Sequence, residues 1–401
     1  MARRQFKKNQ VKASILGYYY YIRGVEKAGK TTLIYDINEK IYGNQDHGLL
    51  ISMGKEDGYK ALPDIQFEVI DNETKIEIEQ KRKRDAKGRV MKDSNGNDII
   101  EETPVEKIIK YGWDSFVELV DDMVIDKIKQ ETDIEIIAID TYDELCKLAA
   151  QKVVRMSNKA NPTKRCESIN GAFGGFNGGF EKFEEIVEEQ FHRLRKVGYT
   201  LFVISHTKVR TIKEKGMTED DAYQMLTTNL DSRFDKVVAH KADVIATIQI
   251  DKEIKDGKLL GTKRYIYFRE DGFVKAGSRF KDIVDRVELS ADNFIKAIED
   301  GIKSSLRRPM TDEEFENKKK TDEQERQEQI EHNQEIDIVK AEIDVERNKV
   351  IGGLIPDLFK AANSDQKEKV KELMNQYGIS KLLNFEENKT EGMEEILKVL
   401  S

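Results

Sequence analysis

Short apolar runs alternate with longer amphipathic stretches over the first 300 residues. The apolar runs have the length and the β-branched or aromatic content of buried strands, and they lie at 14–22, 48–53, 134–140, 200–205, 242–250 and 264–268. Apolar residues recur at helical spacing in 30–42, 117–130 and 180–198. Strands that alternate with helices predict an α/β fold with a mainly parallel sheet covered by helices on both faces.

Two insertions interrupt this alternation. Residues 72–101 resemble a hairpin with strands at 75–80 and 97–100 and a tip rich in Lys and Arg, which is either a solvated turn or a finger that contacts phosphates. The stretch 157–179 is rich in glycine and phenylalanine, and no regular element is predicted for it.

The character of the chain changes after residue 300. Residues 301–349 are highly charged and predict a long solvated helix or a partly disordered arm. Apolar spacing returns in 350–401, which predicts a small helical module. We therefore expect a core at 1–300, an arm at 301–349 and a helical C-terminal region.

Charge is unevenly distributed along the 401 residues, of which 36% are charged. Residues 311–347 contain 14 Asp/Glu and 6 Lys/Arg, so this segment alone accounts for the net charge of −8. The remaining residues together have no net charge, but they include local basic clusters. The acidic balance therefore does not exclude a nucleic-acid partner, because binding depends on local patches.

Cysteine content and hydropathy exclude several classes of protein. Cys146 and Cys166 are the two cysteines, too few for a disulfide scaffold or a four-cysteine zinc site. No stretch of 18 uninterrupted apolar residues suggests a membrane span. The basic N-terminal residues lack the apolar region of a secretion signal. We expect a cytoplasmic protein, in the host cytoplasm if a phage encodes it, with reduced thiols.

The strongest chemical signal is a phosphate-binding loop at residues 24–31, which fit G-x-x-x-x-G-K-[ST]. Backbone N–H groups of such a loop face phosphate oxygens, Lys30 reaches the β- and γ-phosphates, and the Thr31 hydroxyl ligates Mg²⁺. The predicted nucleotide-binding residues are Gly24, Val25, Glu26, Lys27, Ala28, Gly29, Lys30, Thr31 and Thr32.

A second carboxylate is needed to hold the Mg²⁺ water shell. Asp140 follows four apolar residues at the end of a predicted buried strand and is our choice. Asp143 and Glu144, one turn further on, are weaker candidates.

Hydrolysis also needs a group that positions or deprotonates water. Glu56 follows the strand at 48–53 and is preferred over Glu26, which lies inside the phosphate-binding loop. His206 follows the strand at 200–205 and could hydrogen-bond the γ-phosphate and report its presence. The other histidines share no metal spacing, so no zinc site is predicted.

Two further features concern the nucleotide. Arg279, with Lys275 as its companion, is either a finger that reaches a phosphate bound by a neighbouring subunit or part of a solvated turn. A guanine-reading N-K-x-D motif is missing, because the similar string at 158–161 ends in Asn161. ATP is therefore the expected nucleotide.

The order of these motifs resembles the RecA-like P-loop ATPase core, over about residues 12–285. The strings GVEKAGKTT and IIAIDTYDEL resemble its two nucleotide motifs, and His206 stands where the family commonly has a glutamine sensor. The chain is most similar to compact phage members of the single-strand annealing or recombination type. The hairpin and the C-terminal arm depart from the minimal family core.

This resemblance implies two DNA-binding loops, one on each side of the helix at 180–198. Cations bind phosphates and aromatic rings stack on bases in single-stranded DNA sites. The residues implied are Lys164, Arg165, Phe173 and Phe176 in the first loop and Lys208 and Arg210 in the second. The alternative is that the two phenylalanines pack as a lid over the nucleotide or in a subunit seam.

The predicted function is Mg²⁺-dependent ATP hydrolysis coupled to single-stranded DNA binding in phage recombination or replication. The resemblance also implies a homo-oligomer, either a ring or a filament, and the C-terminal module could bind a protein. The alternatives are a replicative helicase or helicase loader, a nucleotide-switched interaction protein without DNA binding and, less favoured, a small-molecule kinase.

Overall fold

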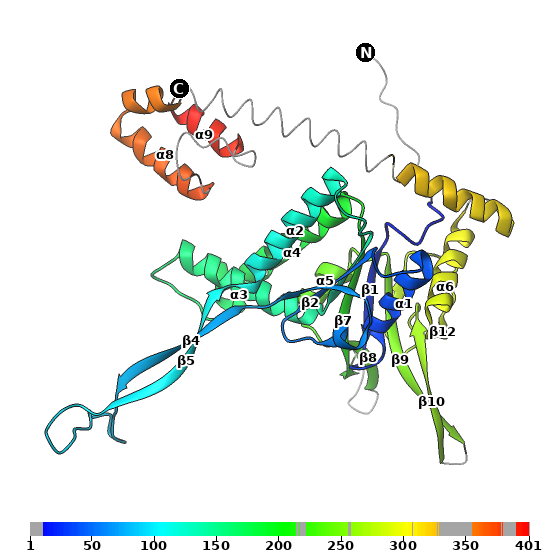
Figure 1. Ribbon diagram of the computed structural model, residues 1–401, viewed down its shortest axis with the longest axis horizontal. Helices are drawn as coiled ribbons and strands as arrows, with labels where there is room; N and C mark the ends of the chain where they lie inside the picture. Colours follow the sequence, from blue (N-terminus) through cyan, green and yellow to red (C-terminus); the bar gives the residue numbers. More distant parts are fainter. Residues whose placement is uncertain are drawn as a thin grey trace. The chain divides into compact units, whose positions relative to one another are not determined.

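The computed structural model describes residues 11–213, 216, 222–255, 258–306, 308–326, 328, 355–377, 379 and 390–400 (Figure 1). The chain divides into two compact units, Met1–Gln324 and Glu325–Ser401. Each unit is described by itself.

The first unit is built on one twisted sheet in the order β12-β10-β9-β1-β7-β6-β2-β3. The strands are β1 (Tyr19–Gly24), β2 (Gly48–Met53), β3 (Gln66–Ile70), β6 (Ile136–Asp140), β7 (Thr200–Ile212), β9 (Val244–Lys255), β10 (Lys258–Tyr267) and β12 (Arg286–Glu288). The six strands from β9 to β3 in this order run parallel. Strand β10 pairs antiparallel with β9, and β12 pairs antiparallel with β10. The short strand β11 (Gly277–Ser278) pairs with β9, and β8 (Tyr223–Thr228) pairs with β7. The predicted α/β fold with a mainly parallel sheet is confirmed.

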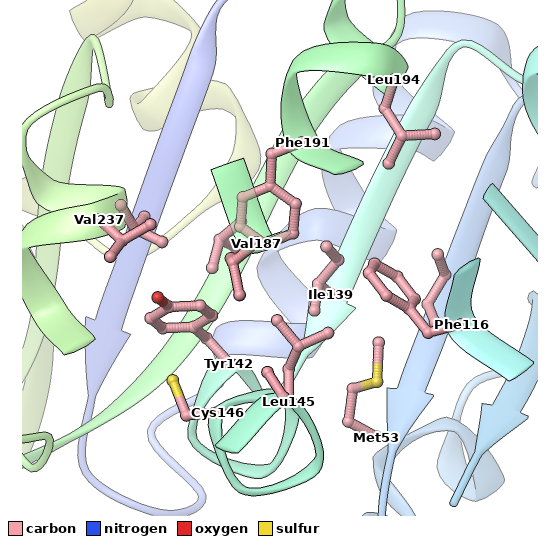
Figure 2. Close-up of a cluster of buried hydrophobic side chains, with 14 of the residues drawn as sticks. Met53, Phe116, Ile139, Tyr142, Leu145, Cys146, Val187, Phe191, Leu194 and Val237 are labelled. Atoms are coloured by element: carbon pink, nitrogen blue, oxygen red, sulfur yellow. The ribbon is translucent and has the colours of Figure 1, made fainter. Parts of the chain in front are cut away.

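Helices cover both faces of this sheet, as the strand sequences require. Along β1, Tyr19 and Tyr21 belong to one hydrophobic cluster and Tyr20 and Ile22 to the other, because successive side chains of a strand point to opposite faces. The first cluster packs against α2 (Gly112–Lys129), α3 (Tyr142–Ala160), α4 (Gly178–Lys196) and α5 (Ser232–Ala239), and Figure 2 shows part of it. The second packs against α1 (Lys30–Tyr42) and α6 (Ala291–Ser305).

The parallel register brings the ends of three strands and the middle of β7 to one edge. Gly24 is level with His206, and Asp140 is level with Ser52 on one side and Ile204 on the other. The carboxyl ends of β1, β6 and β2 therefore meet beside His206 of β7 at this edge, where ligands bind in open α/β sheets.

The charged insertion forms a separate antiparallel hairpin of β4 (Glu73–Arg82) and β5 (Ile100–Lys110), which projects from the sheet-and-helix body (Figure 1). The second strand extends well past residue 101, where the sequence placed the end of the hairpin. Pro104 argues against a strand in the sequence, but a two-stranded ribbon has an outer edge that tolerates proline. The short 3₁₀ helix η1 (Gly58–Ala61) precedes β3.

Order within the glycine-rich stretch was not predicted from the sequence. Helix α3 continues to Ala160, and a 3₁₀ segment, η2 (Ile169–Gly174), precedes α4. A Cβ atom at Gly179 would lie 2.1 Å from the carbonyl oxygen of Ile169. Glycine therefore serves close backbone packing here, which composition alone does not distinguish from flexibility.

The expected boundary at residue 300 falls inside α6. The chain continues into a helix at 312–326, where Phe315 is buried in the second cluster. The buried carboxylate of Asp322 accepts hydrogen bonds from the backbone N–H of Ala13, at 2.5 Å, and from Lys318, at 2.7 Å. Most of the charged arm expected at 301–349 lies outside the described residues.

The second unit has a small helical core of its own. It contains helical residues 355–361, α8 (Ser364–Gln376) and α9 (Thr390–Leu400). Val370, Met393 and Ile396 are buried at its centre. Among the helices that the structure describes in either unit, none is long and apolar enough to cross a membrane.

Candidate nucleotide site

The loop between β1 and α1 has the backbone geometry of a phosphate cradle. Gly29 adopts a φ of 100° directly before the first residue of α1, in the left-handed region that favours glycine. At Gly24, a Cβ atom would meet the carbonyl oxygen of Ile248 at 3.0 Å, so the strand end packs tightly against β9. The N-terminus of α1 opens into this loop, and its unpaired N–H groups favour an anion.

Lys30 and Thr31 are the first residues of α1 and lie inside the loop. The buried Lys30 ammonium donates hydrogen bonds to the carbonyl oxygens of Gly24, at 3.1 Å, and Val25, at 2.9 Å. Burial lowers the pKa of Lys30, and the nearby Asp140 carboxylate opposes that shift. The Lys30 ammonium is thus held inside the loop, where it can bind phosphate oxygens.

Asp140 ends β6 opposite the loop. Its Oδ2 atom accepts a hydrogen bond from the Thr31 hydroxyl at 2.6 Å. Burial raises the pKa of Asp140, while the Thr31 hydroxyl and the Lys30 ammonium lower it in part. Two hard oxygen ligands side by side fit Mg²⁺, which usually binds to one or two protein oxygens together with substrate phosphates and water. No cluster of three or more His, Cys, Asp or Glu side chains suited to a metal occurs in the described part of the chain.

His206, midway along β7, lies beside two of the other predicted residues. Its Nδ1 atom lies 3.3 Å from the Lys30 Nζ atom, and its Nε2 atom lies 3.6 Å from Glu56 Oε1. Glu56 is held in the loop after β2, where its carbonyl oxygen accepts a hydrogen bond from Ser52 at 2.7 Å. The structure thus brings Lys30, Thr31, Glu56, Asp140 and His206 together.

Asp143 has a place that sequence reasoning did not assign to it. Its buried carboxylate accepts hydrogen bonds from the Ser205 hydroxyl at 2.7 Å and from the His206 backbone N–H at 3.0 Å. Asp143 therefore fixes the middle of β7 and, with it, the backbone of His206. The sequence signal that could have pointed to Asp143 was its spacing. It lies three residues after Asp140, in the first turn of α3.

A cavity of about 860 Å³ adjoins this group on the side of Glu56 and His206. Six carboxylates line it, from Glu26, Glu56, Asp143, Glu144, Glu167 and Asp231. Its two Lys/Arg side chains are already paired, Lys147 with Glu144 at 2.5 Å and Arg155 with Asp114 at 3.0 Å. The cavity wall is therefore acidic.

Arg279 is not brought to this group. It lies after β11 and pairs with Asp243 at 3.1 Å, and the Asp243 carboxylate accepts a hydrogen bond from the backbone N–H of Tyr19 at 2.9 Å. Tyr19 begins β1, so Arg279 is at the sheet edge opposite the phosphate-binding loop. A role for Arg279 in the site of a neighbouring subunit stays a prediction.

The predicted DNA-binding residues differ in exposure. Lys164, Arg165 and Lys208 are exposed, and the Phe176 ring is fully exposed at a backbone φ of 49°. Phe173 is partly buried and packs against the first hydrophobic cluster. Arg210 donates a hydrogen bond to the carbonyl oxygen of Leu230 at 2.6 Å, so its guanidinium is already engaged.

The second expected loop is largely a hairpin. Strand β7 runs on to Ile212 and pairs with β8, which begins at Tyr223. Residues 214, 215 and 217–221, at its turn, lie outside the described residues. The strand that contains His206 therefore also contains Lys208, which is exposed, two residues further on.

Comparison with known proteins agrees with this geometry. A family model described as an AAA domain matches residues 17–280, which is more than half of the chain and includes the phosphate-binding loop, Asp140 and His206. No curated protein matches the chain. With its parallel sheet and its Lys30–Thr31–Asp140 arrangement, the chain belongs to the AAA domain family, an ATPase type of P-loop domain.

Proposed function

We propose that this protein hydrolyses ATP with Mg²⁺ and uses the nucleotide state to control binding of single-stranded DNA, as a RecA-like protein of phage recombination or replication. The observation that carries the proposal is the position of His206. It lies within 3.6 Å of both Lys30 and Glu56 and on the strand that continues into the β7–β8 hairpin.

Each residue of the site has its own role in ATP hydrolysis. Lys30 and the loop N–H groups bind the β- and γ-phosphates, and Thr31 and Asp140 would hold Mg²⁺, which neutralises phosphate charge. Glu56 orients the attacking water and accepts its proton as the oxygen bonds to the γ-phosphorus, while ADP departs. His206 donates a hydrogen bond to the γ-phosphate until this bond breaks.

Loss of the γ-phosphate would release the contact at His206 and shift β7. The exposed side chains Lys164, Arg165, Phe176 and Lys208 supply the cations and the aromatic ring that single-stranded DNA sites use. Asp143 would transmit the shift, because it bonds to Ser205 and His206. A nucleotide that binds the two conformations unequally changes DNA affinity by the same coupling free energy.

The test measures fluorescence anisotropy of labelled oligo-dT with and without Mg²⁺–ATP, at low and at raised salt. We expect tight binding that ATP strengthens, that Lys30→Ala makes insensitive to ATP and that salt weakens steeply. A Lys208→Ser/Lys164→Ser variant should lose DNA binding while it keeps ATP hydrolysis. The matched control, Lys40→Ser/Lys60→Ser, alters two exposed lysines elsewhere.

Hydrolysis without DNA binding under any condition would contradict the DNA role and favour a nucleotide-switched interaction protein. ATP-dependent unwinding of a forked duplex would favour the helicase alternative. Lack of both hydrolysis and ATP binding would contradict the proposed function as a whole.

A further inference from the structure

The tip of the β4–β5 hairpin, residues 81–99, folds into two turns. Three backbone hydrogen bonds form a ring where the turns begin. The N–H of Lys83 donates to the carbonyl oxygen of Ile99 at 2.8 Å, that of Ile99 to Met91 at 2.9 Å, and that of Met91 to Lys83 at 2.8 Å. Two short loops leave this ring, and each is closed by one antiparallel bridge. The backbone of the tip is therefore held by its own hydrogen bonds.

The two turns have the same construction. Asp85 and Asp93 occupy equivalent places eight residues apart, and each carboxylate accepts hydrogen bonds from two backbone N–H groups of its own turn, at 2.8 and 2.9 Å for Asp85 and at 2.9 Å for Asp93. The N–H groups of Arg89 and Asn97 make the main contribution that lowers the pKa of these two carboxyls. Both carboxylates thus hold the turns in shape.

The tip keeps a positive charge despite these carboxylates. It contains seven Lys/Arg, all of them exposed, against three Asp. The third carboxylate, Asp98, pairs with Arg82 at 3.2 Å, and Asp85 also pairs with Arg89 at 3.0 Å. Four cations of the tip have no carboxylate partner at any position that the structure describes, and these are Lys83, Arg84, Lys87 and Lys92.

The stem of the hairpin has the opposite charge. Residues 73–80 and 100–110 contain three Lys and six Glu. The ten residues of β4 extend over about 30 Å at about 3.3 Å each, and the hairpin projects from the body of its unit (Figure 1). An acidic stem repels phosphates, so contact with a polyanion is limited to the tip.

We propose that this tip binds the phosphate backbone of double-stranded DNA, as a contact separate from the proposed single-stranded DNA site. Residues 81–99 contain no Phe, Tyr, Trp or His, whereas sites for single strands combine cations with aromatic rings that stack on bases. A duplex keeps its bases stacked inside, and cations bind its two rows of phosphates without reading sequence. A two-stranded β-ribbon also fits the major groove of B-form DNA, whereas that of A-form RNA is too narrow.

Fluorescence anisotropy of the full chain with a labelled DNA duplex, without nucleotide and over a range of salt, tests the proposal. Lys83→Ser/Lys87→Ser/Lys92→Ser should raise the dissociation constant at least about tenfold. It should also make the slope of log affinity against log salt less steep by up to about 3, because each phosphate contact contributes about 0.9 to that slope. Arginine at the same three positions should keep the wild-type affinity, because it keeps the charge.

The matched control removes three lysines from the stem of the same hairpin. Lys75→Ser/Lys107→Ser/Lys110→Ser changes the net charge by the same amount, but each of these lysines pairs with a glutamate. Duplex affinity in this variant should stay within about twofold of the wild type, because paired cations on an acidic stem do not meet phosphates. Equal losses in the tip and stem variants would overturn the proposal, because they would show an effect of overall charge.

A fluorophore at the tip locates the contact independently. A label on Ser94→Cys, in a Cys166→Ser background, should respond when duplex DNA is added, whereas a label on Thr103→Cys in the stem should not. Both positions are exposed, and the native Cys146 is buried. A response only at the stem would contradict a contact at the tip.

The same variants keep this proposal distinct from the proposed function. The tip variant should retain ATP hydrolysis and oligo-dT binding, and duplex binding should persist in Lys30→Ala. A protein that binds duplex DNA through the tip but does not bind oligo-dT would support the tip contact and contradict only the single-stranded DNA role. No duplex binding by the wild type at low salt, a loss of oligo-dT binding alone in the tip variant, or equal affinity for duplex RNA would overturn the proposal.

Discussion

The nucleotide site and the β4–β5 hairpin belong to the same unit, but they are stabilised in different ways. Lys30, Asp140 and Asp143 are buried, and each is hydrogen-bonded to a residue of another element of the sheet-and-helix core. The hairpin has neither cluster behind it, and its ion pairs join exposed side chains of its own two strands.

This difference shows what sheet packing supplies to function. In the site, the register of buried strands fixes the position of charged groups whose burial has a free-energy cost. In the hairpin, charges stay solvated and contribute little to stability. Substitutions in the two regions should therefore act on different quantities.

The largest effect is expected at Glu56. Glu56→Gln should lower the rate of ATP hydrolysis by about 10²–10⁴-fold, because the proton acceptor for water is lost, while ATP binding is kept. Steady-state phosphate release and a fluorescent-nucleotide titration measure the two quantities. Glu68→Gln, an exposed carboxylate on β3, is the control. Unchanged hydrolysis in Glu56→Gln would remove Glu56 from the mechanism.

The next largest effect is on the free energy of unfolding, which should differ between substitutions in the core and in the hairpin. Phe183→Ala, in the first hydrophobic cluster, should lower the free energy of unfolding by about 3–5 kcal/mol through loss of buried area and a residual cavity. Ile78→Ala should change it by about 0.5 kcal/mol or less in dilute protein, because the side chain is exposed. Thermal unfolding followed by circular dichroism compares them, and equal shifts would contradict the division drawn here.

Asp140 should show a conflict between stability and activity. Burial raises its pKa, so the ionised form destabilises the folded protein at neutral pH. Asp140→Asn should therefore raise the melting temperature without nucleotide at pH 7 and abolish Mg²⁺-dependent hydrolysis. The stability difference should shrink as the pH falls toward the ordinary carboxyl pKa of about 3.9, because the wild-type carboxyl then binds its proton. A lower melting temperature in the variant at pH 7 would contradict this account.

The smallest effect is expected when the hairpin is removed. Replacing residues 75–108 with a short Gly-Ser link should leave the melting temperature and the basal ATP hydrolysis nearly unchanged. The sheet and both hydrophobic clusters do not use these residues. A large drop in melting temperature would show that the hairpin stabilises the core.

Local patterns were enough to predict the mainly parallel sheet and to name candidate residues that the structure brings together. The apolar run at 48–53 predicted β2, and G-x-x-x-x-G-K-[ST] placed a turn between a strand and a helix. Both signals are local, since strand burial and the phosphate-binding loop are specified by consecutive residues. Residues that act through a distant partner were harder to assign. Asp143 is an example, because its partners Ser205 and His206 are more than 60 positions away.

Exposure also could not be predicted from composition. Phe173 and Phe176 stand in the same glycine-rich stretch, but the first packs against the core and the second is fully exposed. Arg279 and Lys30 both suggest phosphate contacts by residue type, but the sheet places them at opposite edges. Strand order and direction decide such placements, and neither follows from local hydropathy.

The sequence by itself determined the α/β class and the position of the phosphate-binding loop, because these depend on periodicity and on a contiguous motif, and it named Lys30, Thr31, Asp140, Glu56 and His206 as candidates. The tertiary structure alone decided that these side chains meet at one sheet edge beside an acidic cavity and that Asp143 holds β7 at Ser205 and His206. The physical reason is that strand register and packing join residues that are far apart in the chain, and no local pattern encodes those distances.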